Sequence, residues 1–111
     1  MDSETKWLTQ RITLLQTHLQ ELKELSCREQ KAHQDLKVQH QQPWSQPLNT
    51  DNKAITLVKL VTQQVRQITA LSTEFSTERK ALLACHKQDE FEQNEWIKLE
   101  RERKRNQNLI N

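Results

Sequence analysis

Apolar residues recur over the first third of the chain with the spacing of one helical face. From the first apolar residue the steps are four, three, four and three, which lines the side chains along one side of a helix as a short heptad-like seam. The residues of this stripe are Leu8, Ile12, Leu15, Leu19 and Leu22. The stripe continues through Leu25, Ala32 and Leu36 after an extra three-residue step. The pattern predicts a helix over about residues 4–38, with Asp2 or Ser3 as its N-cap.

A second apolar stripe predicts a long helix over about residues 52–107. Its steps average near 3.6 residues, and its members are Ala54, Leu57, Val58, Val61, Val65, Ile68, Leu71 and Phe75. The hydroxyl-rich stretch 72–77 is a candidate break, because Ser and Thr side chains compete for backbone hydrogen bonds. Residues 78–107 are therefore either a third helix folded back or a continuation of the second, and the absence of Gly and Pro favours continuation.

Residues 39–51 form the connection between the two helices. Pro43 and Pro47 interrupt helical hydrogen bonding there, and Asn49, Thr50 and Asp51 are candidate caps for the second helix. Trp44 either stacks on a ligand or packs against the end of the helix pair. The tendency of tryptophan to be buried favours packing.

Packing of the two stripes against each other predicts an all-α fold, as an antiparallel helical hairpin or a small elongated bundle of two to three helices. We expect residues 1–111 to form a single helical domain. The predicted packing core is Leu8, Ile12, Leu15, Leu19, Leu22, Val58, Val61, Val65, Ile68, Leu71 and Phe75.

Composition supports this class and argues against an enzyme. Glycine is absent, 33% of the 111 residues are hydrophobic and 29% are charged, so a β-rich fold or a thick core is not expected. The four histidines lack metal-ligand or catalytic spacing, and Asp89, Glu90, Glu92 and Glu95 resemble a solvated acidic face. We therefore expect no catalytic residues, metal or cofactor.

Compartment is indicated by the cysteines and the hydropathy. Cys27 and Cys85 show no disulfide framework. No apolar run approaches the length of a membrane span, and the first residues are acidic where a signal peptide would be basic. The sequence predicts a cytoplasmic protein that does not bind membranes.

Positive charge gathers in the second half of the chain. Residues 52–111 carry eleven Lys and Arg against eight Asp and Glu. Lys98, Arg101 and Arg105 share one helix face, where they can follow phosphates or receive an acidic tail, or simply offset the helix dipole. Trp96 either stacks on an unpaired base or packs against the helices. The candidate binding site is Arg79, Lys80, Trp96, Lys98, Arg101, Arg103, Lys104 and Arg105.

Two segments carry a family resemblance. Gln64, Ile68, Ala70 and Leu71 in the second helix, followed by His86, Glu90, Phe91 and Glu92, resemble the bacterial primosomal replication protein PriC family. Lys87 and Gln88 are two extra residues within the second motif, and Gln93 and Asn94 stand where that family has an arginine pair. The resemblance implies replication restart, by binding single-stranded DNA and the single-stranded-DNA-binding protein and by helping to load the replicative helicase. The alternative is a helical chaperone, stalk or adaptor, of secretion or flagellar export type, that binds a partner helix.

Overall fold

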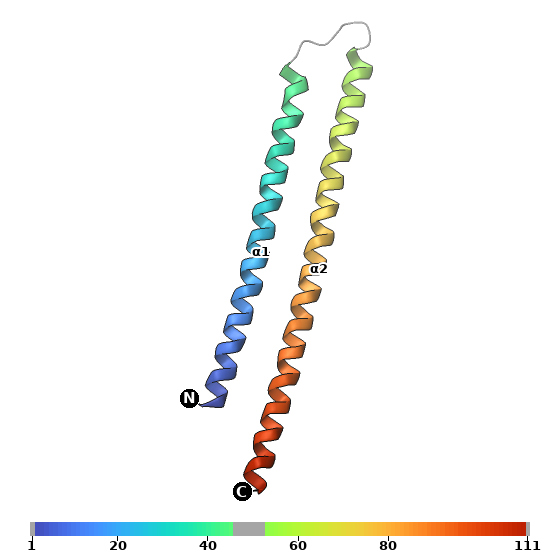
Figure 1. Cartoon of the computed structure of the whole chain (residues 1–111). Coiled ribbons are helices and arrows are strands. Elements are labelled where there is room, and N and C mark those ends of the chain that lie inside the picture. The colour runs from blue at the N-terminus through green and yellow to red at the C-terminus, as the bar shows by residue number, and fades with distance from the viewer. Residues whose placement is uncertain (1, 46–52, 111) are drawn as a thin grey trace. The chain divides into compact units, whose positions relative to one another are not determined.

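Two long helices make up nearly all of the structure. The computed structural model describes residues 2–45 and 53–110. Helix α1 spans Ser3–Gln41, the short 3-10 helix η1 spans Gln42–Ser45, and α2 spans Lys53–Ile110 (Figure 1). No strand occurs in these described ranges, so the predicted all-α class is confirmed. Across the same ranges, neither long helix combines the length and hydropathy needed to span a bilayer.

Local hydrogen bonds account for the start of α1 and for the continuity of α2. The Glu4 amide donates to Asp2 Oδ1 at 3.4 Å, as expected of an N-cap aspartate. Helix α2 runs without a break through residues 72–77. The Thr77 hydroxyl donates to the Thr73 carbonyl at 2.9 Å, so it bonds within the helix instead of ending it. The candidate caps 49–51 and the side chain of Trp44 lie outside the described part of the chain.

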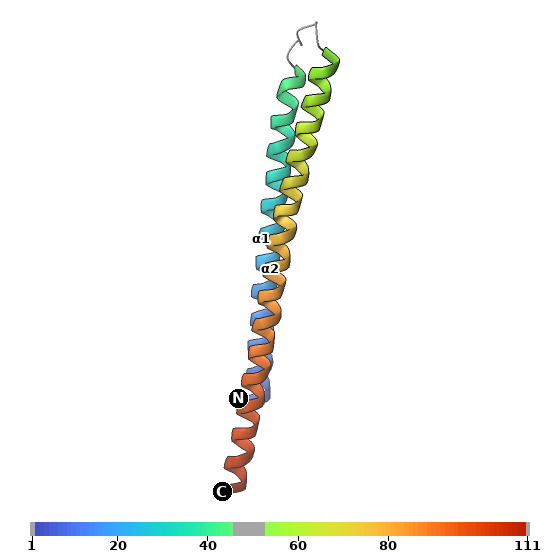
Figure 2. The same cartoon turned by 90° about the vertical axis from the view of Figure 1, so that its right-hand side faces the viewer.

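The chain divides into two compact units. Residues 1–22 and 80–111 form one, named here the terminal unit, and residues 23–79 form the other, the central unit. In the terminal unit Glu4 contacts Arg101 and His18 contacts Asp89. Residue numbers on α2 fall as those of their contact partners on α1 rise, so the two segments pair antiparallel, as in the predicted hairpin. Figure 2 shows the same helices after a 90° turn.

The central unit is built in the same way. Glu29 contacts Arg79 and His40 contacts Gln67, again with descending numbers on α2. The Gln64 side-chain amide also donates to the His40 carbonyl at 3.0 Å, near the end of α1. The central unit is therefore a second antiparallel pair of α1 and α2 segments.

Buried side chains are few and large. In the terminal unit they are Trp7, Ile97 and the two histidines His18 and His86. In the central unit they are Phe75 and Leu25, of which Leu25 has no exposed surface at all. Each unit is therefore held by a thin line of contacts between two helices, and each buried residue carries a large share of the packing.

The least exposed positions follow an 11-residue repeat on both helices. On α1 they are Trp7, Arg11, Leu14, His18, Leu22, Leu25 and Glu29, in steps of four, three, four, four, three and four. On α2 the same steps connect Phe75, Arg79, Leu82, His86, Glu90, Gln93 and Ile97. An 11-residue repeat corresponds to about 3.67 residues per turn, close to the α-helix itself, whereas a heptad corresponds to 3.5.

The structure corrects most of the predicted packing core. Phe75 is buried and Leu22 and Leu71 are half-buried, but the other eight predicted core residues are exposed. The exposed residues are Leu8, Ile12, Leu15, Leu19, Val58, Val61, Val65 and Ile68.

The reason for the difference is geometric and chemical. Each residue turns an α-helix by about 100°, so a contact line through Trp7 and His18 leaves Leu8 and Leu19 facing another direction. Polar side chains in the contact line are tolerated because they pair across it, as His18 does with Asp89.

Candidate interaction surfaces

The predicted basic site lies at the C-terminal end of α2, and one of its members is held by α1. The Arg101 guanidinium donates to both carboxylate oxygens of Glu4, from Nε at 3.0 Å and from Nη2 at 2.8 Å. These hydrogen bonds lower the pKa of the Glu4 carboxyl and raise the pKa of Arg101. Arg101 also lies over the ring of Trp7, with Lys104 at 5.7 Å from the ring centroid. Arg101 therefore links α1 and α2 of the terminal unit.

The remaining members of the predicted site are divided between intramolecular pairs and open surface. Arg103 pairs with Glu100 one turn before it, at 2.7 Å. Arg79 lies in the central unit, where it pairs with Glu29. Lys80, Lys98 and Arg105 are exposed, and Trp96 is 42% exposed. The structure therefore leaves Lys98, Arg105 and Trp96 as the part of the predicted site that faces solvent near the end of α2.

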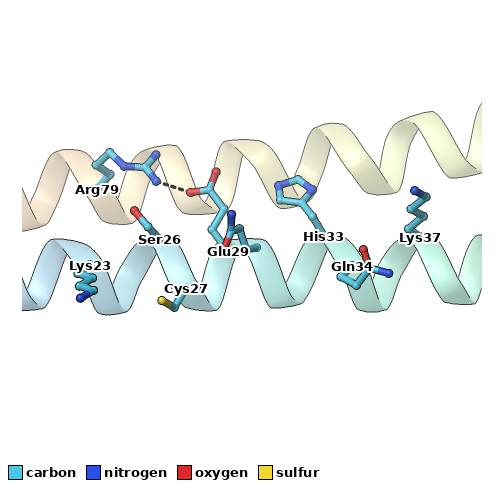
Figure 3. Close-up of a pocket in the computed structure, with 9 residues that line it drawn as sticks. Lys23, Ser26, Cys27, Glu29, His33, Gln34, Lys37 and Arg79 are labelled. Atoms are coloured by element: carbon cyan, nitrogen blue, oxygen red, sulfur yellow. Dashed lines mark hydrogen bonds and ion pairs between the residues drawn. The ribbon is translucent and has the colours of Figure 1, made fainter.

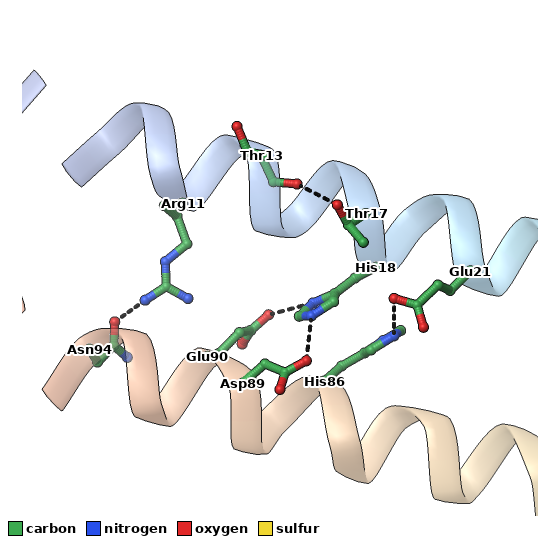
Figure 4. A network of polar contacts seen from close by, with 9 residues as sticks. All are labelled: Arg11, Thr13, Thr17, His18, Glu21, His86, Asp89, Glu90 and Asn94. Carbon is green, nitrogen blue, oxygen red and sulfur yellow. Dashed lines mark hydrogen bonds and ion pairs between the residues drawn. The ribbon is translucent and has the colours of Figure 1, made fainter. Parts of the chain in front are cut away.

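A stacked histidine pair lies inside the terminal unit. The rings of His18 and His86 are parallel within 12°, with centroids 3.9 Å apart. Three carboxylates surround them (Figure 4): Asp89 lies 3.3 Å and Glu90 3.8 Å from the nitrogens of His18, and Glu21 lies 3.8 Å from Nε2 of His86. Nε2 of His86 is buried without a hydrogen-bond partner. The pair forms a buried polar layer within the thin contact line of the terminal unit.

This layer is a packing feature that the sequence analysis missed, because it considered the histidines only as metal ligands or catalytic groups. In the described part of the chain, no group of three or more His, Cys, Asp or Glu side chains is arranged so that it could hold a metal ion. The available sequence signal was spacing. His18 follows Trp7 by 11 residues, and His86 precedes Ile97 by 11 residues.

A shallow groove in the central unit brings together polar side chains without a catalytic arrangement. Cys27 and His33 both line it, beside the ion pair of Arg79 and Glu29 (Figure 3). Both cysteines of the chain are exposed free thiols. Figure 3 shows no hydrogen bond between Cys27 and His33, both of them described residues.

An exposed apolar stripe, named here the valine face, runs along α2 in the central unit. It consists of Ile55, Val58, Val61, Val65 and Ile68, which are 44–65% exposed. The positively charged Lys59 and Arg66 border it, and with Val58 they line a shallow depression. Contiguous exposed apolar surface bordered by polar groups is typical of a binding site.

A second exposed stripe, named here the leucine face, runs along α1 in the terminal unit. It consists of Leu8, Ile12, Leu15 and Leu19, which are 45–68% exposed. Leu83 of α2 lies beside it and joins Leu15 and Leu19 in lining a groove. The two faces together contain all eight residues that were misplaced in the predicted core.

Comparisons with known proteins add no relative. Neither the protein-family models, nor the curated proteins, nor the solved structures contain a match to this chain.

Proposed function

We propose that this protein is a non-enzymatic helical adaptor that binds an acidic amphipathic helix of a partner protein along its valine face. The observation that carries the proposal is the exposure of five β-branched apolar residues on one side of α2. This is the chaperone, stalk or adaptor class that the sequence analysis gave as the alternative to replication restart.

The spacing of the valine face suits a partner helix. Val58, Val61, Val65 and Ile68 follow in steps of three, four and three, which is the a and d spacing of a coiled coil. Burial of such a stripe against the apolar face of another helix contributes roughly 25 cal/mol for each Å² removed from water. A helix laid in this way is one of the recurring modes of peptide recognition.

The charge around the valine face selects the kind of partner. Residues 52–73 contain Lys53, Lys59 and Arg66 but no Asp or Glu. A partner helix with glutamates beside its apolar stripe gains favourable contacts at Lys59 and Arg66, whereas a lysine-bordered helix is repelled. Charge complementarity therefore favours an acidic helix.

A second candidate function is favoured by a different observation. Lys98 and Arg105 are exposed on one face near the end of α2, and a row of cations of this kind can follow the backbone of single-stranded nucleic acid. Under this proposal the protein binds single-stranded DNA or the single-stranded-DNA-binding protein in replication restart, and assists loading of the replicative helicase. The resemblance to the PriC family supports the same function.

One titration separates the two candidates. Three fluorescent probes are used with the full chain: a leucine-based amphipathic helical peptide bordered by glutamate, its lysine-bordered twin, and a single-stranded oligothymidine. We expect the acidic peptide to bind most tightly, and the double variant Val61→Asp and Val65→Asp to weaken it at least about 30-fold, since each charge faces an apolar contact. Fluorescence anisotropy measures all three affinities at two salt concentrations.

The variant Leu99→Asp is the matched control, because Leu99 is also an exposed apolar residue of α2 but lies in the terminal unit. It should leave binding of the acidic peptide unchanged. Equal affinity for both peptides contradicts the acidic partner. Tight oligothymidine binding that falls steeply with salt and is lost in Lys98→Gln with Arg105→Gln supports the second candidate instead.

A further inference from the structure

The valine face of α2 continues into a groove between α1 and α2 of the central unit. Ile68, the last residue of the valine face, lines a hollow together with Leu36 and Lys37 of α1. Lys37 and His33 also line the shallow groove along α1 that Figure 3 shows, with Lys23 at its other end. The two hollows therefore form one depression, named here the cationic groove. It runs along α1 from Lys23 to Lys37 and reaches the valine face at Ile68.

Positive charge dominates the cationic groove. Lys23, Lys37 and Arg79 line it, against a single carboxylate among its lining residues, that of Glu29. Glu29 is paired with Arg79, so these two charges neutralise each other. Neither Lys23 nor Lys37 forms an ion pair with another described residue. The groove therefore offers an anionic ligand two lysine ammonium groups.

The other described carboxylates of the central unit lie outside the cationic groove. Glu78 pairs with Arg28, and Glu24 also interacts with that guanidinium. Asp35 and Glu74 are not among the residues that line the groove. Asp35 precedes Lys37 by two residues, which places it about 160° away around α1. The charge of the groove is thus not cancelled by carboxylates at its border.

The uncharged lining of the groove suits a polypeptide. Gln30, Gln34 and Ser26 line it, and their amide and hydroxyl groups can donate hydrogen bonds to the carbonyls of an extended chain or accept them from its amides. No Phe, Tyr or Trp side chain is among the lining residues. Single-stranded nucleic acid is held by stacking of its bases on such rings as well as by cations. The lining therefore favours an acidic peptide segment over nucleic acid.

The length of the groove sets the length of that segment. Lys37 follows Lys23 by 14 residues, which corresponds to about 21 Å along a helix. An extended chain advances about 3.3 Å for each residue, so about six or seven residues span this distance. A carboxylate at each end of such a segment reaches one of the two lysines.

We infer that the acidic helix bound on the valine face continues into an acidic extended segment of about six or seven residues, which lies in the cationic groove. The inference rests on the proposed function, because Ile68 joins the groove to the valine face. Lys37 and Lys23 bind carboxylates of the segment, and Gln30 and Gln34 bind its backbone. The binding surface of the central unit thus extends from α2 onto α1.

Fluorescence anisotropy with tailed peptides tests the inference on the full chain. The glutamate-bordered helical peptide is compared with versions that carry seven further residues, either rich in aspartate or neutral, at one end or the other. We expect the acidic tail at the end that lies beside Ile68 to bind about fivefold more tightly than the neutral tail, as for two exposed ion pairs. Lys23→Gln with Lys37→Gln should remove this gain and leave binding of the untailed peptide unchanged. Lys31→Gln is the control, because Lys31 is an exposed lysine of α1 outside the groove.

The native thiols report where the tail lies. Cys27 lines the groove and Cys85 belongs to the terminal unit, and both are exposed. In the single-cysteine chains Cys85→Ser and Cys27→Ser, reaction with an uncharged maleimide is followed with saturating peptide. We expect the acidic tail to slow the reaction of Cys27 and to leave that of Cys85 unchanged, whereas the untailed peptide slows neither.

The outcomes separate this inference from the proposed function. If the untailed peptide binds but the acidic tail adds no affinity at either end, gains it equally in Lys23→Gln with Lys37→Gln, or leaves Cys27 unprotected, the inference is overturned and the proposed function stands. If no peptide binds, both are overturned. Protection of Cys27 by oligothymidine and not by the acidic tail would assign the groove to nucleic acid, which also overturns the inference.

Discussion

Replacing Leu25 by aspartate is expected to lower the free energy of unfolding by about 4 kcal/mol or more, because an ionised carboxylate is placed where no solvent and no partner reach it. Leu25 is the one described side chain with no exposed surface, and it belongs to the central contact line with Phe75. A protein of this size has a total stability of only about 5–15 kcal/mol. Urea unfolding followed by circular dichroism measures the change.

Leu99→Asp is the matched control for this substitution, since Leu99 is 63% exposed. It should change stability by less than about 1 kcal/mol, as is usual for surface sites. Val61→Asp should likewise change stability by less than about 1 kcal/mol, because Val61 is exposed on the valine face. If Val61→Asp unfolds the protein and Leu25→Asp does not, the contact line described here is wrong.

Replacing Trp7 by alanine is expected to cost about 3–5 kcal/mol, the range for deleting a large buried aromatic ring. Trp7 is 6% exposed in the terminal unit, and its ring also holds Arg101 and Lys104 above its face. Its loss therefore removes packing and leaves Glu4 and Arg101 as an exposed pair, which contributes little alone.

Trp96→Ala is an internal comparison for Trp7→Ala, because the same atoms are deleted from a side chain that is 42% exposed. We expect a loss below about 1.5 kcal/mol for Trp96→Ala. Thermal unfolding monitored by circular dichroism compares the two variants. Equal destabilisation by both would contradict the burial of Trp7 and the position of Trp96 at the solvent.

Periodicity predicted the helices because it depends on local residues. The absence of glycine, the position of Pro43 and the 3.6-residue repeats are sufficient to place two helices and the connection between them. Continuity of α2 through residues 72–77 also follows from local chemistry, since Thr77 bonds to the carbonyl of Thr73.

The direction in which each helix faces its partner was not predictable from one stripe. On α1 the most apolar line passes through Leu8 and Leu19, whereas the contact line passes through Trp7 and His18. The second line contains polar residues whose partners lie far away in sequence. His18 meets Asp89, 71 residues later, and a helix read by itself does not reveal such pairing.

The residues of the predicted basic site all lie on α2, but the role of Arg101 was not visible in the sequence. Its partner Glu4 lies 97 residues upstream. Charge spacing within α2 identified which cations share a face, and only the pairing of the helices shows which of them are already neutralised. Lys98 and Arg105 are the better residues for testing nucleic-acid binding.

Each unit is held together by one thin line of contacts between α1 and α2. The two apolar faces lie outside these contact lines. Within the terminal unit the leucine face borders residues of both charges, such as Glu4 and Arg11, and within the central unit the valine face is bordered by the cations Lys59 and Arg66. The cations beside the valine face favour an acidic helix as its occupant. This assignment requires that the apolar stripes stay outside the contact lines.

Thiol accessibility measures that requirement most directly. In a chain with Cys27 and Cys85 replaced by serine, a single cysteine is placed at position 15 or at position 25, and its reaction with a charged maleimide is followed at protein concentrations too low for association. Cysteine at position 15 should react nearly as fast as in urea, and cysteine at position 25 should be protected at least about 100-fold, as expected when reaction requires local unfolding. Protection at position 15 with free reaction at position 25 would contradict the account.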